Sequence, residues 1–330
     1  MAEPALRAGG EVPVTLSVVI GLSVVVVAIQ DGEAVVLTVR PHDPATDTPS
    51  TEAGLPFGPF DPLGHRTFDL AVRAFVTEQT RFELGYVEQL YTFGDKGRDA
   101  PRAEVGAGPA RVVSVGYLAL APYARDTHAP DTAWAPWSRF FPWEDWRHGR
   151  PPLIDETIRP ALLKWSAGDL ERLSRGRLLF ALDSTPWNEE RVLERYELLY
   201  EAGLVTEAAR DRGEAPKAVA LGEPMISDHR RILATGLSRL RGKIKYRPVV
   251  FELMGPEFTL YELQRTVEAI AGIPLHKQNF RRVIDRTQLV EGLGRYRVET
   301  GGRPAELFRF RREVLSEKPA YGLSLPSVRD

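Results

Sequence analysis

The first apolar pattern in the chain predicts a buried β-hairpin. Residues 12–29 are almost wholly apolar and dominated by valine, and a second apolar run spans residues 34–39. Between them, Asp31-Gly32 is a turn signal that favours a two-residue hairpin loop. The first run is nearly long enough to cross a bilayer, but its β-branched composition favours strands. We therefore expect no membrane-spanning helix and, because acidic residues precede the run, no signal peptide.

Mixed helix and strand patterns continue to about residue 125. Further strands are expected at residues 86–93 and 111–121, where β-branched and aromatic residues gather. Residues 67–80 carry apolar side chains at helical spacing and are predicted to form a helix. Loops rich in proline and glycine separate these elements. The range 1–125 is therefore predicted to be an α/β domain.

The amino-acid composition and the hydrophobic pattern change after this domain. Tryptophan and phenylalanine residues crowd between Trp134 and Trp146, and helical patterns follow at residues 158–173 and 189–202. We interpret residues 126–225 as a tryptophan-rich helical insertion. Clustered aromatic side chains bury large apolar areas, so we expect them to form core rather than a ligand-binding surface.

A further helix is expected at residues 227–240. Ser227 is a candidate N-cap, and Leu233, Leu237 and Leu240 form an apolar stripe on one face. Lysine and arginine residues then alternate with other residues up to Arg247. The range 226–245 is thus predicted to be a closing helix that runs into a basic connector.

The C-terminal part of the chain carries the pattern of a helix-turn-helix. Thr259 and Glu262 have the spacing of a capping box, which predicts the start of a first helix. Gly272 and Pro274 end that helix. A second helix is expected over residues 276–286. Residues 290–297 and 307–312 are short strand candidates around a glycine-rich tip, as expected for a wing.

The second of these helices has a face suited to reading DNA. Its buried side is formed by Phe280 and Ile284, whereas its other side carries amides and arginines. Arginine recognises guanine and asparagine or glutamine recognises adenine in the major groove. The tip of the wing adds one arginine, which is typical of a phosphate or minor-groove contact. The candidate DNA-binding residues are Thr259, Lys277, Gln278, Asn279, Arg281, Arg282, Arg286 and Arg303.

Charge is distributed unevenly along the chain. The whole protein carries a net charge of −2, but residues 228–312 contain eighteen lysine and arginine residues against nine acidic ones. A basic module attached to an acidic body is typical of a DNA-binding domain joined to another function. The 330 residues include no cysteine, which excludes disulfides and cysteine-based metal sites and fits a reducing cytoplasm.

These segments resemble a known family. Residues 246–254, 258–264, 279–282 and 301–310 look like the winged-helix half of the Nudix-related transcriptional regulators of NAD metabolism, the NrtR type and the related NadQ-like proteins. Upstream, residues 86–99 and 111–120 look like the strand and loop that these regulators share with ADP-ribose-hydrolysing Nudix proteins. The resemblance implies a Nudix-like α/β/α sandwich with a helical insertion, followed by a winged helix-turn-helix over residues 246–315 and a tail, 316–330.

The Nudix catalytic motif is degenerate in this chain. The family motif places three glutamates on one helical face, where they share Mg²⁺ ions. At the corresponding run, residues 73–78, two of the three are replaced by Ala74 and Thr77, which leaves Glu78. One carboxylate holds Mg²⁺ weakly, so we expect neither a metal nor a catalytic residue here and predict that the protein is not an enzyme.

A nucleotide pocket can persist after hydrolysis is lost, because phosphate contacts do not need the missing acids. The resemblance implies a nucleotide effector such as ADP-ribose or an NAD-like molecule, and no cofactor. Arg73 and Glu78 could instead form a structural ion pair, and Arg98 could stabilise a loop. The candidate ligand-binding residues are Arg40, Arg73, Glu78, Phe93, Arg98 and Arg111.

The sequence therefore predicts a cytoplasmic, ligand-responsive regulator, a repressor of NAD or related cofactor metabolism. It is expected to bind a palindromic operator as a homodimer, with no membrane partner. Two alternatives stay open. One is a Nudix hydrolase whose acids have moved, to Glu83, Glu88 or carboxylates of the insertion. The other is a protein-interaction module, in which the winged helix binds another protein.

Overall fold

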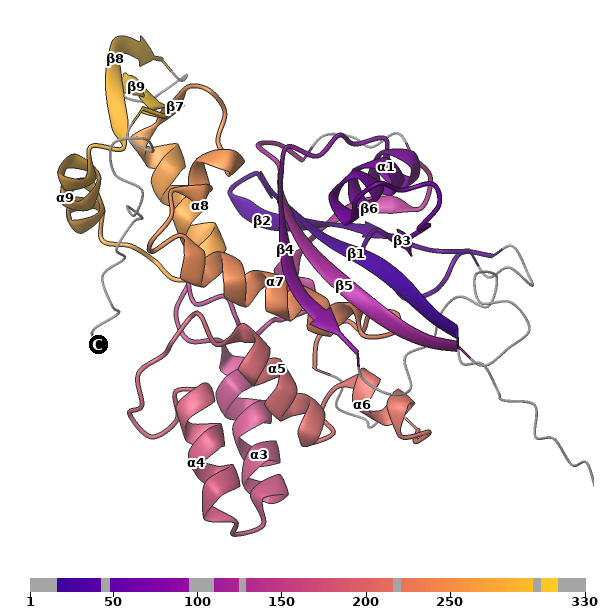
Figure 1. Cartoon of the computed structure of the whole chain (residues 1–330). Coiled ribbons are helices and arrows are strands. Elements are labelled where there is room, and N and C mark those ends of the chain that lie inside the picture. The colour runs from indigo at the N-terminus through magenta and orange to yellow at the C-terminus, as the bar shows by residue number, and fades with distance from the viewer. Residues whose placement is uncertain are drawn as a thin grey trace, which may run out of the picture.

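A mixed β-sheet with helices on both faces forms the N-terminal domain (Figure 1). The computed structural model describes residues 17–42, 48–94, 110–124, 129–215, 221–298 and 304–313. The sheet has the order β4-β5-β1-β2-β6, with β3 paired to β1, and only the β1–β5 pair is parallel among the described strands. Its elements are β1 (Ser17–Gln30), β2 (Glu33–Val39), β3 (Phe57–Pro59), α1 (Phe68–Thr80), β4 (Tyr86–Phe93), β5 (Ala110–Leu120) and β6 (Thr132–Pro136).

The expected hairpin is the centre of this sheet. Strands β1 and β2 pair antiparallel, with Gln30 opposite Glu33 across the two-residue turn. Asp31 and Gly32 have φ angles of 52° and 78°, the left-handed values that a tight hairpin turn of this type requires. Asp31 tolerates this conformation and Gly32 adopts it without strain.

Strand β1 is largely apolar, and both of its faces are buried over residues 22–28. Val24 and Val26 pack in one core cluster with the apolar face of α1, whereas Val25 and Val27 pack in a second cluster on the opposite face. A strand covered on both sides shows no polar alternation. The sequence pattern that could have suggested a membrane span is thus explained by an α/β/α sandwich. Over the described ranges, no helix is long and apolar enough to cross a membrane.

The insertion is largely helical, as expected, but its limits differ from the prediction. Strand β6 pairs with β2 and belongs to the sheet, so the sheet extends beyond residue 125. The single helix expected at 158–173 is two helices, because Ala167 and Gly168 take left-handed φ angles of 47° and 88°. The helices are α3 (Arg159–Ser166), α4 (Leu170–Leu179), α5 (Val192–Glu201) and α6 (Thr206–Asp211), with a short 3₁₀ turn at Trp137–Arg139 and a π-helical turn at Ile154–Ile158.

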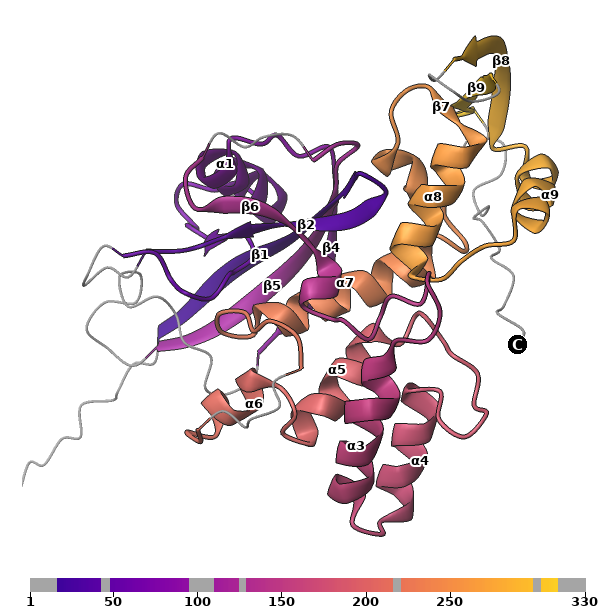
Figure 2. The same ribbon diagram turned by 180° about the vertical axis from the view of Figure 1, so that it is seen from behind.

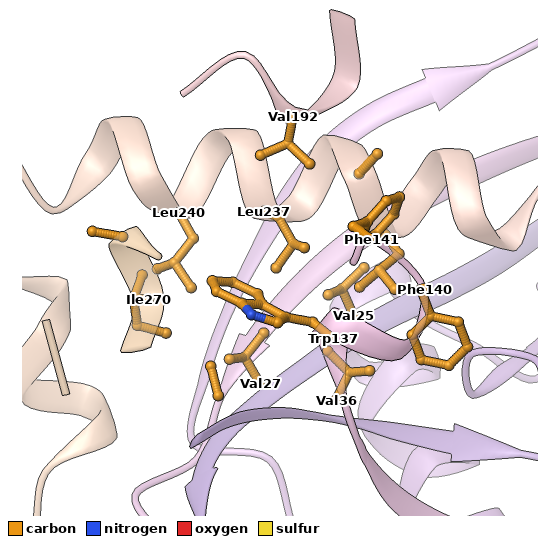
Figure 3. Close-up of a cluster of buried hydrophobic side chains, with 14 of the residues drawn as sticks. Val25, Val27, Val36, Trp137, Phe140, Phe141, Val192, Leu237, Leu240 and Ile270 are labelled. Carbon is orange, nitrogen blue, oxygen red and sulfur yellow. The ribbon is translucent and has the colours of Figure 1, made fainter. Parts of the chain in front are cut away.

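The aromatic residues of the insertion form core, as predicted. Trp137, Phe140 and Phe141 are each 1% exposed, and they lie between the sheet and a long helix, α7 (His229–Lys243) (Figure 3). That helix also buries Leu237 and Leu240 against them. This core joins the sheet, the insertion and α7 into one packed structure.

The start of α7 does not use the expected cap. Asp228 is the N-cap residue and provides no side-chain capping bond, whereas Ser227 lies before it with a left-handed φ of 48°. Further along, Gly236 allows α7 to approach the sheet closely, since a Cβ atom there would lie 3.1 Å from Val25. Helix α7 therefore crosses the sheet at this glycine.

The C-terminal unit has a helix-turn-helix and a three-stranded sheet (Figures 1 and 2). The predicted capping box is present: Thr259 Oγ1 accepts from the Glu262 amide at 3.1 Å, and Glu262 Oε2 accepts from the Thr259 amide at 2.7 Å. Gly272 ends the first helix with a φ of 69°. The elements are a 3₁₀ turn at Val249–Leu253, β7 (Phe258–Thr259), α8 (Leu260–Ala271), α9 (Lys277–Thr287), β8 (Val290–Arg297) and β9 (Ala305–Phe310).

Candidate nucleic-acid interface and ligand cavity

Helix α9 lies at the edge of the molecule and presents a polar face to solvent (Figure 2). Phe280 and Ile284 are 2% and 1% exposed and attach the helix to α8 and the wing strands. In the part of the chain that the structure describes, the outward side chains make no hydrogen bond or ion pair with the protein. These exposed residues are Lys277, Gln278, Asn279, Arg281, Arg282 and Arg286. They are free to contact base edges and phosphates.

Two other candidate DNA contacts have different positions. Thr259 is only 5% exposed and its hydroxyl is occupied by the capping bond, so the structure assigns it to holding α8 rather than to contacting DNA. Arg303 lies outside the described residues, as does the tip of the wing. The wing strands β8 and β9 pair with Val290 opposite Phe310 and Arg297 opposite Ala305.

Several cations of the basic connector are paired within the protein. Arg241 is fully buried and pairs with Glu144 at 2.6 Å. Lys245 pairs with Glu189 at 2.6 Å. A regional net charge counts these buried or paired cations together with the exposed ones of α9, so it overstates the positive charge available to DNA.

Lys243, a further cation of this stretch, forms a cluster with Glu88 and Tyr86 of β4. Its ammonium donates to Glu88 and, at 2.8 Å, to the Tyr86 hydroxyl, which also donates to Glu88. Burial alone would raise the pKa of Glu88, but the hydrogen bonds from Lys243 and Tyr86 outweigh it and hold the pKa below the ordinary 4.5.

We expect the Glu88 cluster to make stability depend on pH in the acidic range. A carboxyl whose pKa is lowered by folding contributes stability that is fully present above its unfolded pKa and is lost as pH falls through the folded pKa. The free energy of unfolding should therefore decrease below pH 4.5 more steeply in the wild type than in Glu88→Gln. Urea unfolding between pH 7 and pH 3 measures this; parallel curves for the two proteins would contradict the assignment.

A large cavity lies between the sheet and the helices α5 and α7. Its volume is about 1650 Å³. Gly21, Ser23 and Phe93 line it from the sheet, and the opposite wall comes from α5 and α7. A cavity of this size exceeds the usual range for small-molecule sites, so a nucleotide with two phosphates fits within it.

The helical wall of the cavity carries charged and hydroxyl side chains. Arg231 pairs with Glu197 at 2.6 Å, and the Tyr200 hydroxyl donates to Asp211 at 2.8 Å. Burial lowers the pKa of Arg231, but the hydrogen bond to Glu197 outweighs it and the pKa is raised, so the cation is permanent. Burial and Asp211 raise the pKa of Tyr200, which keeps its hydroxyl protonated. The guanidinium and the phenol on this wall are thus each paired with a carboxylate.

The structure does not bring the candidate ligand residues together. Phe93 lines the large cavity, whereas Arg40 lines a second cavity of about 340 Å³. Glu78 is exposed on α1, which covers the other face of the sheet. Arg98 and the side chain of Arg111 lie outside the described residues; the backbone of Arg111 pairs with Val18 of β1.

Arg73 has a structural position, but not with the partner that the sequence suggested. Its Nε donates to Asp69 at 2.9 Å, one helical turn away, instead of to Glu78. Its other nitrogens donate to the carbonyls of Leu84, at 2.6 Å, and Gly85, at 3.2 Å. Arg73 therefore fixes the loop between α1 and β4, and all of its contacts are within the protein.

The polar residues of the cavity wall were missed by sequence reasoning. Arg231, Glu197 and Tyr200 lie on helices whose apolar faces were identified, but the pattern does not tell a solvent-facing residue from one that faces a cavity. Only the packing of α5 beside α7 brings them together.

The three motif positions lie together on α1. Ala74, Thr77 and Glu78 are all exposed, and among these three positions only Glu78 offers a carboxylate. The helix also carries Asp69, whose carboxylate accepts from Arg73. Within the described ranges, no group of three or more histidine or acidic side chains is placed to hold a metal ion. One carboxylate does not fit Mg²⁺, which needs several oxygen ligands.

Comparison with known proteins gives the same picture of the fold. The family model of the NrtR DNA-binding winged helix domain matches residues 250–310. The chain is 38% identical over 91 residues to the ADPR responsive transcriptional repressor NtrR of Acinetobacter baylyi, a match that covers 28% of this chain and 36% of that protein. The matched region thus spans about a third of the curated relative's length.

Solved structures match over much more of the chain. NrtR of Shewanella oneidensis complexed with a 27mer DNA has a TM-score of 0.54 at 21% identity, covering 90% of this chain and 95% of that one. A MutT/nudix family protein from Enterococcus faecalis has a TM-score of 0.51 at 18% identity, covering 92% and 90%. The chain therefore has the fold of a Nudix domain followed by an NrtR-type winged helix, with a helical insertion between them.

Proposed function

We propose that the protein is a transcriptional regulator that binds double-stranded DNA through α9 and responds to a nucleotide metabolite. The observation that carries the proposal is the exposed face of α9, whose amide and arginine side chains have no partner among the described residues. This face lies within the segment that matches the NrtR winged-helix model. The similarity to a named repressor supports repression as the proposed mode of regulation. Control of genes of NAD or related cofactor metabolism, in the cytoplasm, is proposed from the family resemblance of the sequence.

The mode of DNA binding that we propose requires two copies of the chain. A homodimer would place two α9 helices in successive major grooves, so the operator is expected to be palindromic. The proposed base-reading residues of α9 are Gln278, Asn279 and Arg282. Contacts to the DNA backbone or to bases are proposed for Lys277, at the start of the helix, and for Arg281 and Arg286 further along it. Arg303 at the wing tip is proposed as a phosphate or minor-groove contact.

The proposed effector site is the large cavity between the sheet and helices α5 and α7. The relative of Acinetobacter baylyi is named as ADPR responsive, so ADP-ribose is the first ligand to test. Phe93 and Arg231 offer an aromatic ring and a guanidinium inside the cavity. Arg40, Arg98 and Arg111 stay candidates for phosphate contacts. We withdraw Arg73 and Glu78 from the proposed site, since both lie on α1, which covers the other face of the sheet.

We propose that the Nudix domain binds nucleotides without hydrolysing them. With Mg²⁺ present, the purified protein should release no AMP from ADP-ribose above the no-enzyme background, because the motif helix lacks the carboxylates that hold the metal. Anion-exchange chromatography of the reaction mixture measures this. AMP release that disappears in Glu78→Gln, Glu83→Gln or Glu88→Gln would establish the hydrolase alternative instead.

The experiment that tests the regulator is selection of bound sequences from a random DNA pool, repeated with ADP-ribose and with NAD. We expect a palindromic consensus sequence to be enriched. The degree of its enrichment should change when one of these ligands is added. DNA binding should weaken steeply as salt is raised, because phosphate contacts release counterions. Failure to enrich any sequence at low salt would favour the protein-interaction alternative.

A further inference from the structure

Three charged side chains are buried together where α7, the insertion and the winged helix meet. Glu144 is 1% exposed, and Arg195 of α5 and Arg241 of α7 are fully buried. Arg195 donates to both oxygens of Glu144, at 2.5 and 2.8 Å, and Arg241 donates to one of them at 2.6 Å. The Glu144 carboxylate thus accepts hydrogen bonds from two guanidinium groups.

Arg241 also reaches the DNA-binding unit. Its Nε donates to the carbonyl of Ile270 at 2.9 Å, in the last turn of α8. The Trp146 amide donates to the carbonyl of Gly272 at 2.6 Å, so the insertion contacts the same helix end. The unpaired carbonyls at the C-terminus of α8 are therefore satisfied by α7 and by the insertion.

Electrostatic interactions stabilise the contact between Arg241 and the C-terminal end of α8. Burial and the neighbouring Arg195 lower the pKa of Arg241, whereas Glu144 and Glu189 act to raise it. The negative end of the α8 dipole also favours the cation. If α8 moved away from α7, the Arg241 Nε would lose its acceptor and the Ile270 carbonyl would lose its donor, which is unfavourable.

The same helix α7 forms a wall of the effector cavity. Arg231, Thr235 and Ser238 lie on its cavity face. Helix α5 packs beside α7 and is bonded to it: the Leu193 amide donates to Ser238 Oγ at 3.0 Å, and Arg231 pairs with Glu197. The cavity therefore lies between the sheet on one side and the α5–α7 pair on the other.

We propose that Arg241 is a positioning residue that locks the winged helix onto the α5–α7 pair. Because α7 also forms a wall of the effector cavity, a ligand that shifts α7 there would shift α8, and with it α9, through this contact. This inference rests on the proposed function for its ligand and DNA, but the lock itself is a property of the unliganded protein.

The chain offers a matched control for Arg241. Arg230 is on the same helix and equally buried, and it donates to Glu207 at 3.2 Å and to the carbonyl of Phe140 at 2.6 Å. Its hydrogen bonds to the described residues go to Phe140, Glu207 and Leu221, and none of them reaches α8. Replacing either arginine by methionine removes one guanidinium and keeps the apolar stem. In Arg241→Met, Glu144 still accepts hydrogen bonds from Arg195. In Arg230→Met, Glu207 still accepts a hydrogen bond from the Met225 amide. Each variant therefore leaves the buried carboxylate with a donor.

The first measurement needs no ligand. Because the chain has no cysteine, spin labels can be attached at Lys164→Cys on α3 and Asp285→Cys on α9, both exposed positions. Double electron–electron resonance should give a narrow distance distribution in the wild type and in Arg230→Met, and a clearly broader one in Arg241→Met. Equal widths in all three proteins would overturn the lock.

The second measurement concerns coupling. The ratio of DNA affinities with and without ADP-ribose should be about 5- to 150-fold in the wild type, the usual range for coupled sites. Arg241→Met should bring this ratio near one while ADP-ribose still binds, as followed by calorimetry; Arg241→Lys should restore part of it, and Arg230→Met should retain it. An unchanged ratio in Arg241→Met contradicts the proposal.

The two measurements separate the possible failures. If the wild type binds neither DNA nor ADP-ribose, the proposed function is wrong, and the width of the spin-label distribution still decides whether Arg241 locks the winged helix. If the wild type binds both and Arg241→Met responds to ADP-ribose as the wild type does, the regulator stands and the role of Arg241 is refuted.

Discussion

Alanine at Arg282 or at Asn279 should weaken binding to the selected operator by about 1–3 kcal/mol for each base contact that is lost. This corresponds to roughly 5- to 150-fold in the dissociation constant. The reason is geometric: both side chains are exposed on α9, on the side away from Phe280 and Ile284, and have no partner among the described residues. Fluorescence anisotropy with a labelled operator at fixed salt measures the change.

The control for these variants is Lys164→Ala, which removes an exposed cation from α3 in the insertion. It should leave the affinity within about twofold, since surface substitutions away from a contact have small effects. Thermal unfolding should be unchanged in all three proteins. If neither α9 variant weakens binding, this helix does not read the operator and the proposed interface is wrong.

Alanine at Trp137 should destabilise the protein by about 3–5 kcal/mol, the usual loss for a large buried aromatic side chain. Trp137 is 1% exposed and lies between Val27 of the sheet and Leu237 and Leu240 of α7 (Figure 3). Its ring also lies 4.9 Å from the guanidinium carbon of Arg241. The variant therefore leaves a cavity at the point where the sheet, the insertion and α7 meet.

Urea unfolding followed by circular dichroism measures this loss. Trp165→Ala is the matched comparison, because that tryptophan is only half-buried on α3 and packs on Arg172 at 4.8 Å. It should cost clearly less than Trp137→Ala. A loss below about 1 kcal/mol at Trp137 would be within the range of ordinary surface changes and would contradict its place in the core.

Local patterns in the sequence were sufficient for the elements that depend on neighbouring residues. The Asp31-Gly32 turn, the Thr259–Glu262 capping box and the end of α8 at Gly272 each involve residues within four positions of one another, and the structure has all three. Helix α9 was equally predictable from the sequence, because Phe280 and Ile284 are one turn apart and define its buried side.

Contacts between distant segments were decided only by the tertiary structure. The sequence shows a basic connector at the end of α7 but does not show that Arg241 pairs with Glu144, almost a hundred positions away. Strand β6 looked like part of the insertion because its role depends on pairing with β2. The cavity wall formed by Arg231 and Glu197 exists because α5 packs beside α7. Hydrophobic periodicity tells which side of an element is buried, but not which partner buries it. The sequence alone therefore determined the winged helix and the exposed polar face of α9. The tertiary structure decided which of the charges are paired and where the large cavity lies.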